Sequence, residues 1–216
     1  MSNSQPQVSS QPAKNAYVYV DGFNLYYGAL NKKSLGLKWL NLESLCQKLF
    51  PTVNIKKIKY FTAGVSGKFD LNKPVRQRTY WRALRTIPDL EIIEGRFLIV
   101  PQKIHITQDV CMIGKVPKEK GTDVNLAIHL VNDAHLKKFD IGIVISNDSD
   151  LAGAIRVVTQ ELKLSVNVAN PYDKFNKQII RYATSQKKVR RGAVLNSQFA
   201  QVITDGAGTF SKPPSW

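Results

Sequence analysis

The sequence predicts an α/β protein, a three-layer α/β/α sandwich built around a mainly parallel central sheet. The main observation is that short runs of β-forming residues alternate with longer helical patterns along most of the 216 residues. In addition, the run IGIVIS is apolar throughout and bounded by polar residues, as is typical of a strand buried on both faces. The chain is 43% hydrophobic and long enough to bury one sizeable core.

The first elements follow from local patterns and capping residues. The segment AYVYV at 16–20 predicts a strand, and residues 24–30 predict a short helix. Asn41 is placed to cap a helix over LESLCQKLF, and Pro51 follows as a stop. Residues 55–63, IKKIKYFTA, are mostly apolar and β-prone, and they predict a second strand.

The middle of the chain continues this alternation. Residues 73–87 predict a helix, because Pro74 lies near the start and the apolar residues have compatible spacing. Residues 90–100 predict a third strand with Gly95 in its middle, and residues 104–113 predict a hairpin arm beside it.

The second half of the chain predicts further strand and helix units. Thr122 is expected to cap a largely buried helix. The predicted elements are helices at 123–136, 149–162 and 174–184 and strands at 141–146 and 164–169.

The two ends of the chain differ from this pattern. Residues 1–15 are polar and are expected to form a flexible leader, with one domain at 16–185. Residues 186–216 form a tail that begins basic. Its apolar residues have helical spacing, so we expect it to dock on the domain as a short helix. These residues are Leu195, Phe199, Val202 and Ile203.

The charge of the chain points to a polyanionic partner. Thirty-one Lys and Arg stand against 16 Asp and Glu, a net charge of +15, which favours phosphate-rich partners through counterion release. Nucleic acid is the first candidate and an anionic membrane surface the second. No apolar stretch approaches the roughly 18–20 residues that span a bilayer. Cys46 and Cys111 lack metal-ligand spacing, and a pair alone is no disulfide framework, which is typical of a protein in a reducing cytoplasm.

Four aspartates are candidates for the chemistry of this chain. Asp21 follows the AYVYV strand, and Asp148 and Asp150 follow IGIVIS in the segment SNDSD. Asp123 lies at the start of a predicted helix in KGTDV. In a parallel sheet, ligands bind beyond the carboxyl ends of the strands, so all four can face one rim. Carboxylates gathered there repel each other unless a cation binds, and hard oxygen ligands select Mg²⁺ or Mn²⁺.

Each acid also has a purely structural interpretation. Asp21 could cap the following helix, and Asp123 could be a first-turn acid favoured by the helix dipole. Asp148 and Asp150 are harder to explain in this way, because capping one helix does not need both. With a metal bound, such acids would support one-ion or two-ion hydrolysis of a phosphodiester.

Basic and aromatic residues supply candidate substrate contacts. Arg78, Arg82 and Arg85 share a predicted helix face, and Lys187 and Arg190 belong to a patch after the last helix. Lys56, Lys57 and Lys59 cluster around the second strand, where an ordinary solvated face is the alternative explanation. Single-stranded nucleic acid is often bound by a basic groove with aromatic stacking surfaces. Tyr26 and Asn24, which follow Asp21, are therefore further candidate contacts.

These motifs together resemble a known family. The segments VDGFNLYYGAL, KGTDVNLAIHLV, ISNDSDLAGAIRVV and TFSKPPSW are similar to NYN-domain proteins of the LabA-like branch of the PIN-like nuclease superfamily. The resemblance implies a PIN-like fold at 16–185 and a metal-dependent ribonuclease. It carries over onto Asp21, Asp123, Asp148 and Asp150 as the metal-binding, catalytic acids. Asn147 stands where many relatives have Gly, a departure that leaves these acids in place.

The predicted function is therefore an endoribonuclease that hydrolyses single-stranded or structured RNA with Mg²⁺ or Mn²⁺ in the cytoplasm. A non-catalytic RNA-binding or regulatory module on the same fold stays open, as does a DNA-acting or phosphatase-type metal enzyme. The sequence also leaves open whether a second copy of the chain or a regulatory protein is a partner. No membrane partner is expected.

Overall fold

The computed structural model describes residues 13–31, 36–68, 70–105 and 111–216. Residues 1–12 of the predicted leader, and the middle of the predicted hairpin arm at 106–110, therefore lie outside the described residues. Among the helices of the described ranges, none is long and apolar enough to cross a membrane.

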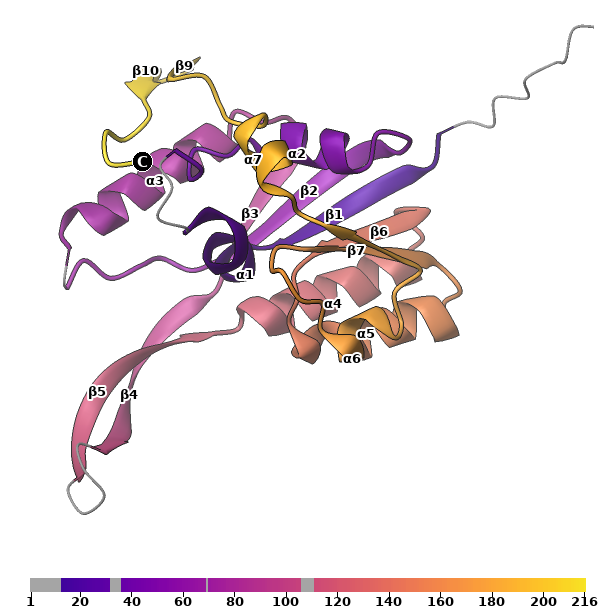
Figure 1. Cartoon of the computed structure of the whole chain (residues 1–216), viewed down its shortest axis with the longest axis horizontal. Helices are drawn as coiled ribbons and strands as arrows, with labels where there is room; N and C mark the ends of the chain where they lie inside the picture. The colour runs from indigo at the N-terminus through magenta and orange to yellow at the C-terminus, as the bar shows by residue number, and fades with distance from the viewer. Residues whose placement is uncertain (1–12, 32–35, 69, 106–110) are drawn as a thin grey trace, which may run out of the picture.

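The described residues form one six-stranded sheet in the order β3-β2-β1-β6-β7-β8, and every neighbouring pair in it is parallel (Figure 1). The parallel sheet predicted from the sequence is thus confirmed. The strands are β1 (Asn15–Asp21), β2 (Asn54–Thr62), β3 (Leu90–Glu94), β6 (Ile141–Ile145), β7 (Ser165–Asn170) and β8 (Ser185–Lys188).

Helices cover both faces of the sheet, which confirms the three-layer sandwich (Figure 1). On one face lie α1 (Gly22–Leu25), the π-helical turn η1 (Tyr26–Leu30), α2 (Leu42–Leu49), α3 (Asn72–Leu84) and α7 (Arg191–Leu195). On the other face lie α4 (Thr122–His135), η2 (Ser149–Leu151), α5 (Ala152–Arg156), η3 (Val157–Glu161) and α6 (Lys177–Ile180). The helix predicted at 149–162 is thus a continuous stretch of three helical types.

The alternation of side chains along β1 divides the core into two halves. Val18 and Val20 pack with α1, α2 and α3, whereas Tyr19 between them packs with α4 and α5. Successive residues of a strand point to opposite faces, so a strand with helices on both sides must be apolar at nearly every position. The segment AYVYV meets this requirement, which explains why β1 lies at the centre of the sheet.

A long antiparallel hairpin leaves the sheet between β3 and α4. It consists of β4 (Arg96–His105) and β5 (Cys111–Lys120) and extends away from the body (Figure 1). The single strand predicted at 90–100 was therefore wrong, because the chain leaves the sheet at Gly95. A Cβ atom there would lie 2.7 Å from Thr122 Oγ1 and 2.9 Å from Glu119 Oε1. A larger residue at this position would therefore require the neighbouring side chains at the start of α4 to shift.

Two further local predictions are corrected. The helix predicted at 174–184 is short, and the chain then forms β8, an edge strand beside β7 that extends the domain past residue 185. Every residue of β8 is exposed, so no apolar pattern in the sequence predicted this strand.

Helix α4 begins at Thr122 with Gly121, rather than the predicted Thr122, as its cap. Gly121 has a left-handed conformation with φ of 94°. The Thr122 N–H and hydroxyl instead donate hydrogen bonds to the Glu119 carboxylate.

The tail packs on the core, but it does not form the predicted helix. After α7, the chain forms an antiparallel pair of strands, β9 (Val202–Asp205) and β10 (Gly208–Ser211). Phe199 packs against the indole of Trp39 with ring centroids 5.7 Å apart, whereas Leu195 and Val202 are exposed. Trp216 also packs against Trp39, at 6.4 Å. Contacts with Trp39, rather than helical periodicity, therefore determine the path of the tail.

Candidate metal centre

The order of the strands determines where the acidic motifs meet. From β1, the chain builds β2 and β3 to one side, and it later builds β6, β7 and β8 to the other. The order of the sheet thus reverses between β1 and β6, and a crevice opens at the carboxyl ends of strands at such a point. Asp21 ends β1, and Asp148 follows β6 after two residues. Both acids therefore reach this crevice.

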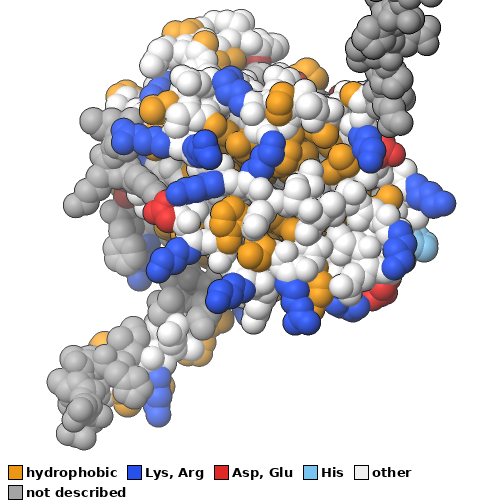
Figure 2. Space-filling view, turned by 45° about the vertical axis from the view of Figure 1, so that its right-hand side comes forward, with side chains coloured by type: hydrophobic (Ala, Val, Ile, Leu, Met, Phe, Trp, Pro, Cys, Tyr) orange, Lys and Arg blue, Asp and Glu red, His pale blue; other side chains and the backbone are white. Residues whose placement is uncertain are grey.

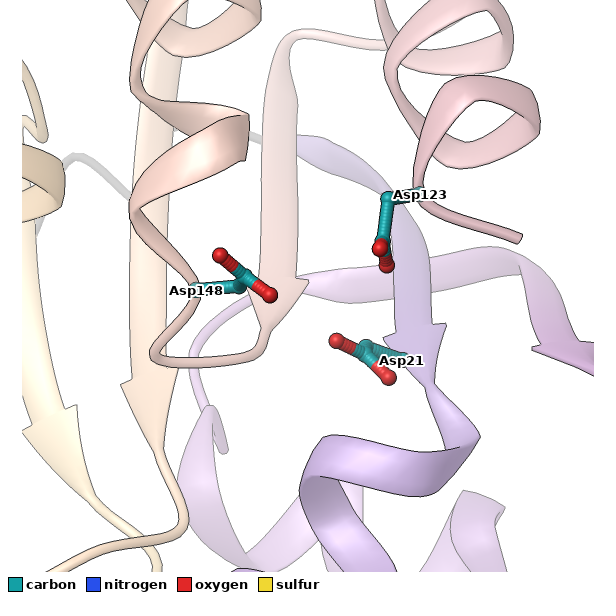
Figure 3. Close-up of side chains that lie close together, drawn as sticks. All are labelled: Asp21, Asp123 and Asp148. Atoms are coloured by element: carbon teal, nitrogen blue, oxygen red, sulfur yellow. The ribbon is translucent and has the colours of Figure 1, made fainter. Parts of the chain in front are cut away.

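Three of the four predicted acids converge there. Asp21, Asp123 and Asp148 each offer a carboxylate oxygen, and these three oxygens all lie within 4.8 Å of one another. Figure 3 shows the three side chains pointing toward a common centre, from the end of β1, the start of α4 and the loop after β6. Asp150 is exposed and is not part of this group; its backbone N–H donates a 3.0 Å hydrogen bond to the Asp148 carboxylate.

Hydrogen bonds hold the carboxylate of Asp21 in place. It accepts from the backbone N–H of Asn24 at 2.9 Å and from the hydroxyl of Ser146 at 2.9 Å. The same hydroxyl accepts from the N–H of Asp148 at 3.1 Å. Ser146 therefore connects two of the acids. Gly22 is needed beside Asp21, because a Cβ atom there would lie 2.7 Å from the Phe61 carbonyl oxygen.

The surroundings favour the protonated forms of two acids. Burial, reinforced by the charges of Asp123 and Asp148, raises the pKa of Asp21 to about 7. Burial and the charges of Asp148, Glu119 and Asp150 raise the pKa of Asp123 to about 6. Both shifts express the cost of gathering negative charge in a partly dry crevice, and a bound cation would offset that cost.

The crevice has a volume of about 310 Å³, and its walls contain residues that the sequence analysis did not select. Glu119, at the end of β5, faces the crevice beside Asp123. Phe97 of β4 and Tyr172 after β7 also line it, and Phe97 contacts the ring of Phe23 at 5.9 Å. In the sequence, the only indication of a role for Glu119 in the site was that it is an acid four positions before Asp123. The hairpin thus supplies part of the site.

The predicted substrate contacts lie at different distances from the acids. Asn24 lines the crevice, and its amide oxygen accepts a 2.9 Å hydrogen bond from the N–H of Asn147. Tyr27 lines the crevice rather than Tyr26, whose ring lies 5.2 Å from that of Tyr27.

None of the five predicted basic contacts is among the residues described as lining the crevice. Arg82 donates to the Asp205 carboxylate at 2.7 and 2.6 Å and lies over the ring of Phe210. Lys187 donates to the carbonyl oxygen of Leu49 at 2.7 Å. Arg78, Arg85 and Arg190 are exposed. A role for these five in substrate binding stays a prediction, with Arg82 already engaged by the tail.

The donor set of the crevice fits a hard divalent cation. Its ligand candidates are carboxylates, with Glu119 as a nearby fourth acid, and no imidazole or thiol is among the residues described as lining it. Oxygen-only donors suit Mg²⁺ or Mn²⁺, whereas non-haem iron oxygenases use two His and one carboxylate. The cluster therefore has the composition of a divalent-metal site.

Three comparisons place this chain among known proteins. The family model of the NYN domain matches residues 15–188. The 6-hydroxy-3-succinoylpyridine 3-monooxygenase HspA of Pseudomonas putida (strain DSM 28022 / S16) is 27% identical over 248 residues, covering 98% of this chain and 78% of that protein. The crystal structure of a protein of unknown function from Vibrio parahaemolyticus RIMD 2210633 superposes with a TM-score of 0.56. Its sequence identity is 14%, and the match covers 85% of this chain and 97% of that one.

Proposed function

Because this chain belongs to the NYN-domain family, we propose that it is a metal-dependent ribonuclease of the PIN-like type, in the LabA-like branch. One observation carries the proposal. Asp21 lies more than a hundred residues before Asp123 and Asp148 in the sequence, yet the three bring carboxylate oxygens within 4.8 Å of one another at the reversal point of the sheet. Gathering three carboxylates, one of them buried, is unfavourable for folding alone, which supports a selected site.

The three aspartates would hold the divalent ion, Mg²⁺ or Mn²⁺. When bound, such an ion lowers the pKa of a water ligand and stabilises the negative charge that develops on a phosphate. The protein contributes the position of the ligands: Ser146 and the Asn24 N–H orient Asp21, and the Asp150 N–H orients Asp148. Ionisation of Asp21 and Asp123, whose pKa values are raised, prepares the crevice for a cation.

The charge of the molecule supports a polyanionic substrate. The net charge is +15, and on the face drawn in Figure 2 the Lys and Arg side chains are spread widely while acidic ones are few. Such a surface attracts a phosphate backbone at long range, and the negative crevice would become attractive to it once a cation is bound. We propose RNA as the substrate and the cytoplasm as the site of action.

The test is cleavage of end-labelled single-stranded RNA and of DNA of matched sequence, in Mn²⁺, Mg²⁺ or EDTA. The parent protein is compared with Asp148→Asn and with Asp140→Asn, an exposed acid that accepts a hydrogen bond from the Asn15 N–H. We expect metal-dependent RNA products from the parent and Asp140→Asn, and none from Asp148→Asn. Cleavage that persists in EDTA and in Asp148→Asn would overturn the proposal. RNA binding without products would favour a binding module, and DNA products a DNA-acting enzyme.

A second candidate function is oxidation of a small aromatic acid. The observation that favours it is the extent of the similarity to the monooxygenase HspA, which covers 98% of this chain and so includes most of the tail beyond residue 188. The carboxylate donor set argues for hydrolysis instead. Incubation with the pyridine substrate of that relative, O₂ and a reduced nicotinamide tests it. A hydroxylated product with matching oxidation of the nicotinamide would establish this function.

A further inference from the structure

A second cavity lies next to the metal centre. It has a volume of about 430 Å³, within the range of small-molecule sites, and it lies between α1, η1, α3 and the end of the tail. Phe23 and Tyr27 line both this cavity and the acidic crevice, so the two spaces share a wall. None of the three clustered aspartates is among the residues that line it.

Aromatic rings form much of the wall of this cavity. The rings belong to Tyr26, Tyr27, Tyr60, Tyr80, Trp81 and Trp216. They are held by each other: Trp216 contacts Tyr80 at 5.8 Å, and Tyr60 contacts Tyr80 at 6.3 Å. The hydroxyl of Tyr80 donates a 2.9 Å hydrogen bond to the Leu40 carbonyl oxygen. Rings fixed in this way offer flat faces to another ring at little entropic cost.

The wall also contains a buried donor that lacks a partner. Trp81 is 7% exposed, and its indole N–H has no hydrogen-bond acceptor in the described part of the chain. Buried polar groups without partners are rare in folded proteins. This donor belongs to a side chain that lines the cavity.

The charged residues of the cavity are mostly basic. Lys38, Lys73 and Arg76 line it together with one acid, Asp70, which pairs with Arg76. Lys38 lies 5.6 Å from the centre of the Tyr26 ring, and Lys73 is exposed in the first turn of α3. The excess of positive charge favours an anionic group close to the aromatic faces.

We propose that this aromatic cavity is a binding site for a planar aromatic ring that carries an anionic group. Such a ligand has two sources: a nucleotide of a nucleic acid whose backbone reaches the metal centre, or a free aromatic carboxylate. The tail forms part of the site, because Trp216, which lies beyond the NYN match at 15–188, lines the cavity. The proposal rests on neither proposed activity, since none of the three clustered aspartates lines the cavity.

The test is isothermal titration calorimetry of the full chain in EDTA, which keeps divalent ions out of the metal centre. The probes are uridine 5′-monophosphate and pyridine-3-carboxylate. The controls are cyclohexanecarboxylate, an anion without an aromatic ring, and pyridine-3-carboxamide, a ring without charge. We expect at least one ring anion to bind about tenfold more tightly than both controls. Binding of the nucleotide alone assigns the site to nucleic acid, and binding of the carboxylate alone assigns it to a free acid.

Variants of the cavity residues test whether the ring anions bind in this cavity. Lys73→Glu and Trp216→Leu should each weaken it by about tenfold or more. Lys137→Glu, an exposed charge just after α4 on the other face of the sheet, should leave it unchanged. Asp148→Asn should bind like the parent even if it has lost nuclease activity, which separates this site from the metal centre. Should neither ring anion bind, or should Lys73→Glu, a surface change, bind like the parent, the proposal is overturned.

Discussion

The amide oxygen of Asn24 accepts a 2.9 Å hydrogen bond from the backbone N–H of Asn147, 123 positions further along the chain. This bond ties the turn after β1 to the loop after β6, which are the two segments that supply Asp21 and Asp148. Asn147 in turn accepts from the Asn176 N–H at 2.8 Å and donates to the Lys174 carbonyl oxygen at 3.0 Å. These hydrogen bonds hold the turn after β1, the loop after β6 and the loop after β7 in fixed positions relative to one another.

Asn24→Ala should loosen the metal centre without removing a ligand. Loss of the hydrogen bond should lower the free energy of unfolding by about 1 kcal/mol and weaken binding of Mn²⁺. Calorimetric titration with Mn²⁺ and thermal unfolding measure the two effects. Asn54→Ala, which removes an exposed 3.1 Å hydrogen bond to Asn15 far from the rim, is the matched control. Unaltered Mn²⁺ affinity in Asn24→Ala would contradict a positioning role.

Asp150→Asn should be much milder than Asp148→Asn. The Asp150 carboxylate is exposed and outside the group of three, and it acts on Asp123 mainly through its charge. Both variants keep the Asp150 N–H that contacts residue 148, and asparagine can still accept it. We expect Mn²⁺ affinity to fall less than about tenfold in Asp150→Asn. Equal loss of metal binding in the two variants would instead assign a ligand role to Asp150.

Stability without metal should fall as the pH rises. The pKa of Asp21 is about 7 and that of Asp123 about 6 in the folded chain, against an ordinary value of 3.8 for both. Between pH 4 and 7 the folded state therefore holds more protons than the unfolded state, so the free energy of unfolding decreases with pH. Two shifts of this size correspond to a loss on the order of 5 kcal/mol, which urea unfolding in EDTA measures.

Divalent metal should reverse this loss. Mn²⁺ binds the ionised carboxylates, so it should raise the melting temperature more at pH 8 than at pH 5. Asp21→Asn should flatten the pH dependence in EDTA, because it removes the group with the larger shift. A parent protein whose stability in EDTA rises from pH 4 to 7 would show that these pKa values are not raised.

The Arg82 pair with Asp205 should protect the tail. Its two short hydrogen bonds, and a third of 3.0 Å to the Gly208 carbonyl oxygen, connect α3 to the β9–β10 hairpin. We expect Arg82→Ala to accelerate chymotrypsin cleavage in the tail, at Phe199 or Phe210. Arg78→Ala, which removes an exposed arginine one helical turn before Arg82 in α3, should be cut at the parental rate. Identical rates for all three proteins would mean that other contacts hold the tail.

The parts predicted well from the sequence are those set by local pattern. Short apolar runs that alternate with helical patterns predicted the positions of β1, β2, β6 and β7. The Asn41 side chain caps α2, as predicted, by accepting a 3.0 Å hydrogen bond from the Ser44 N–H. The position of Asp21 and Asp148 directly after such strands brings them to one rim in a parallel sheet. In contrast, β8 and the β9–β10 hairpin have no apolar period of their own, and only their partners define them.

Contacts between segments far apart in the sequence determine which charged residues are exposed and which are buried in ion pairs. Lys59 appeared to belong to a basic patch, but it is 6% exposed and pairs with buried Asp133, 74 positions away. By itself, then, the sequence determined the fold class and the acidic motifs, because strand burial and the residues that follow a strand are local properties. Only the tertiary structure separated Asp150 from the other three acids, added Glu119 and closed the aromatic cavity with Trp216, because each depends on segments that meet only after folding.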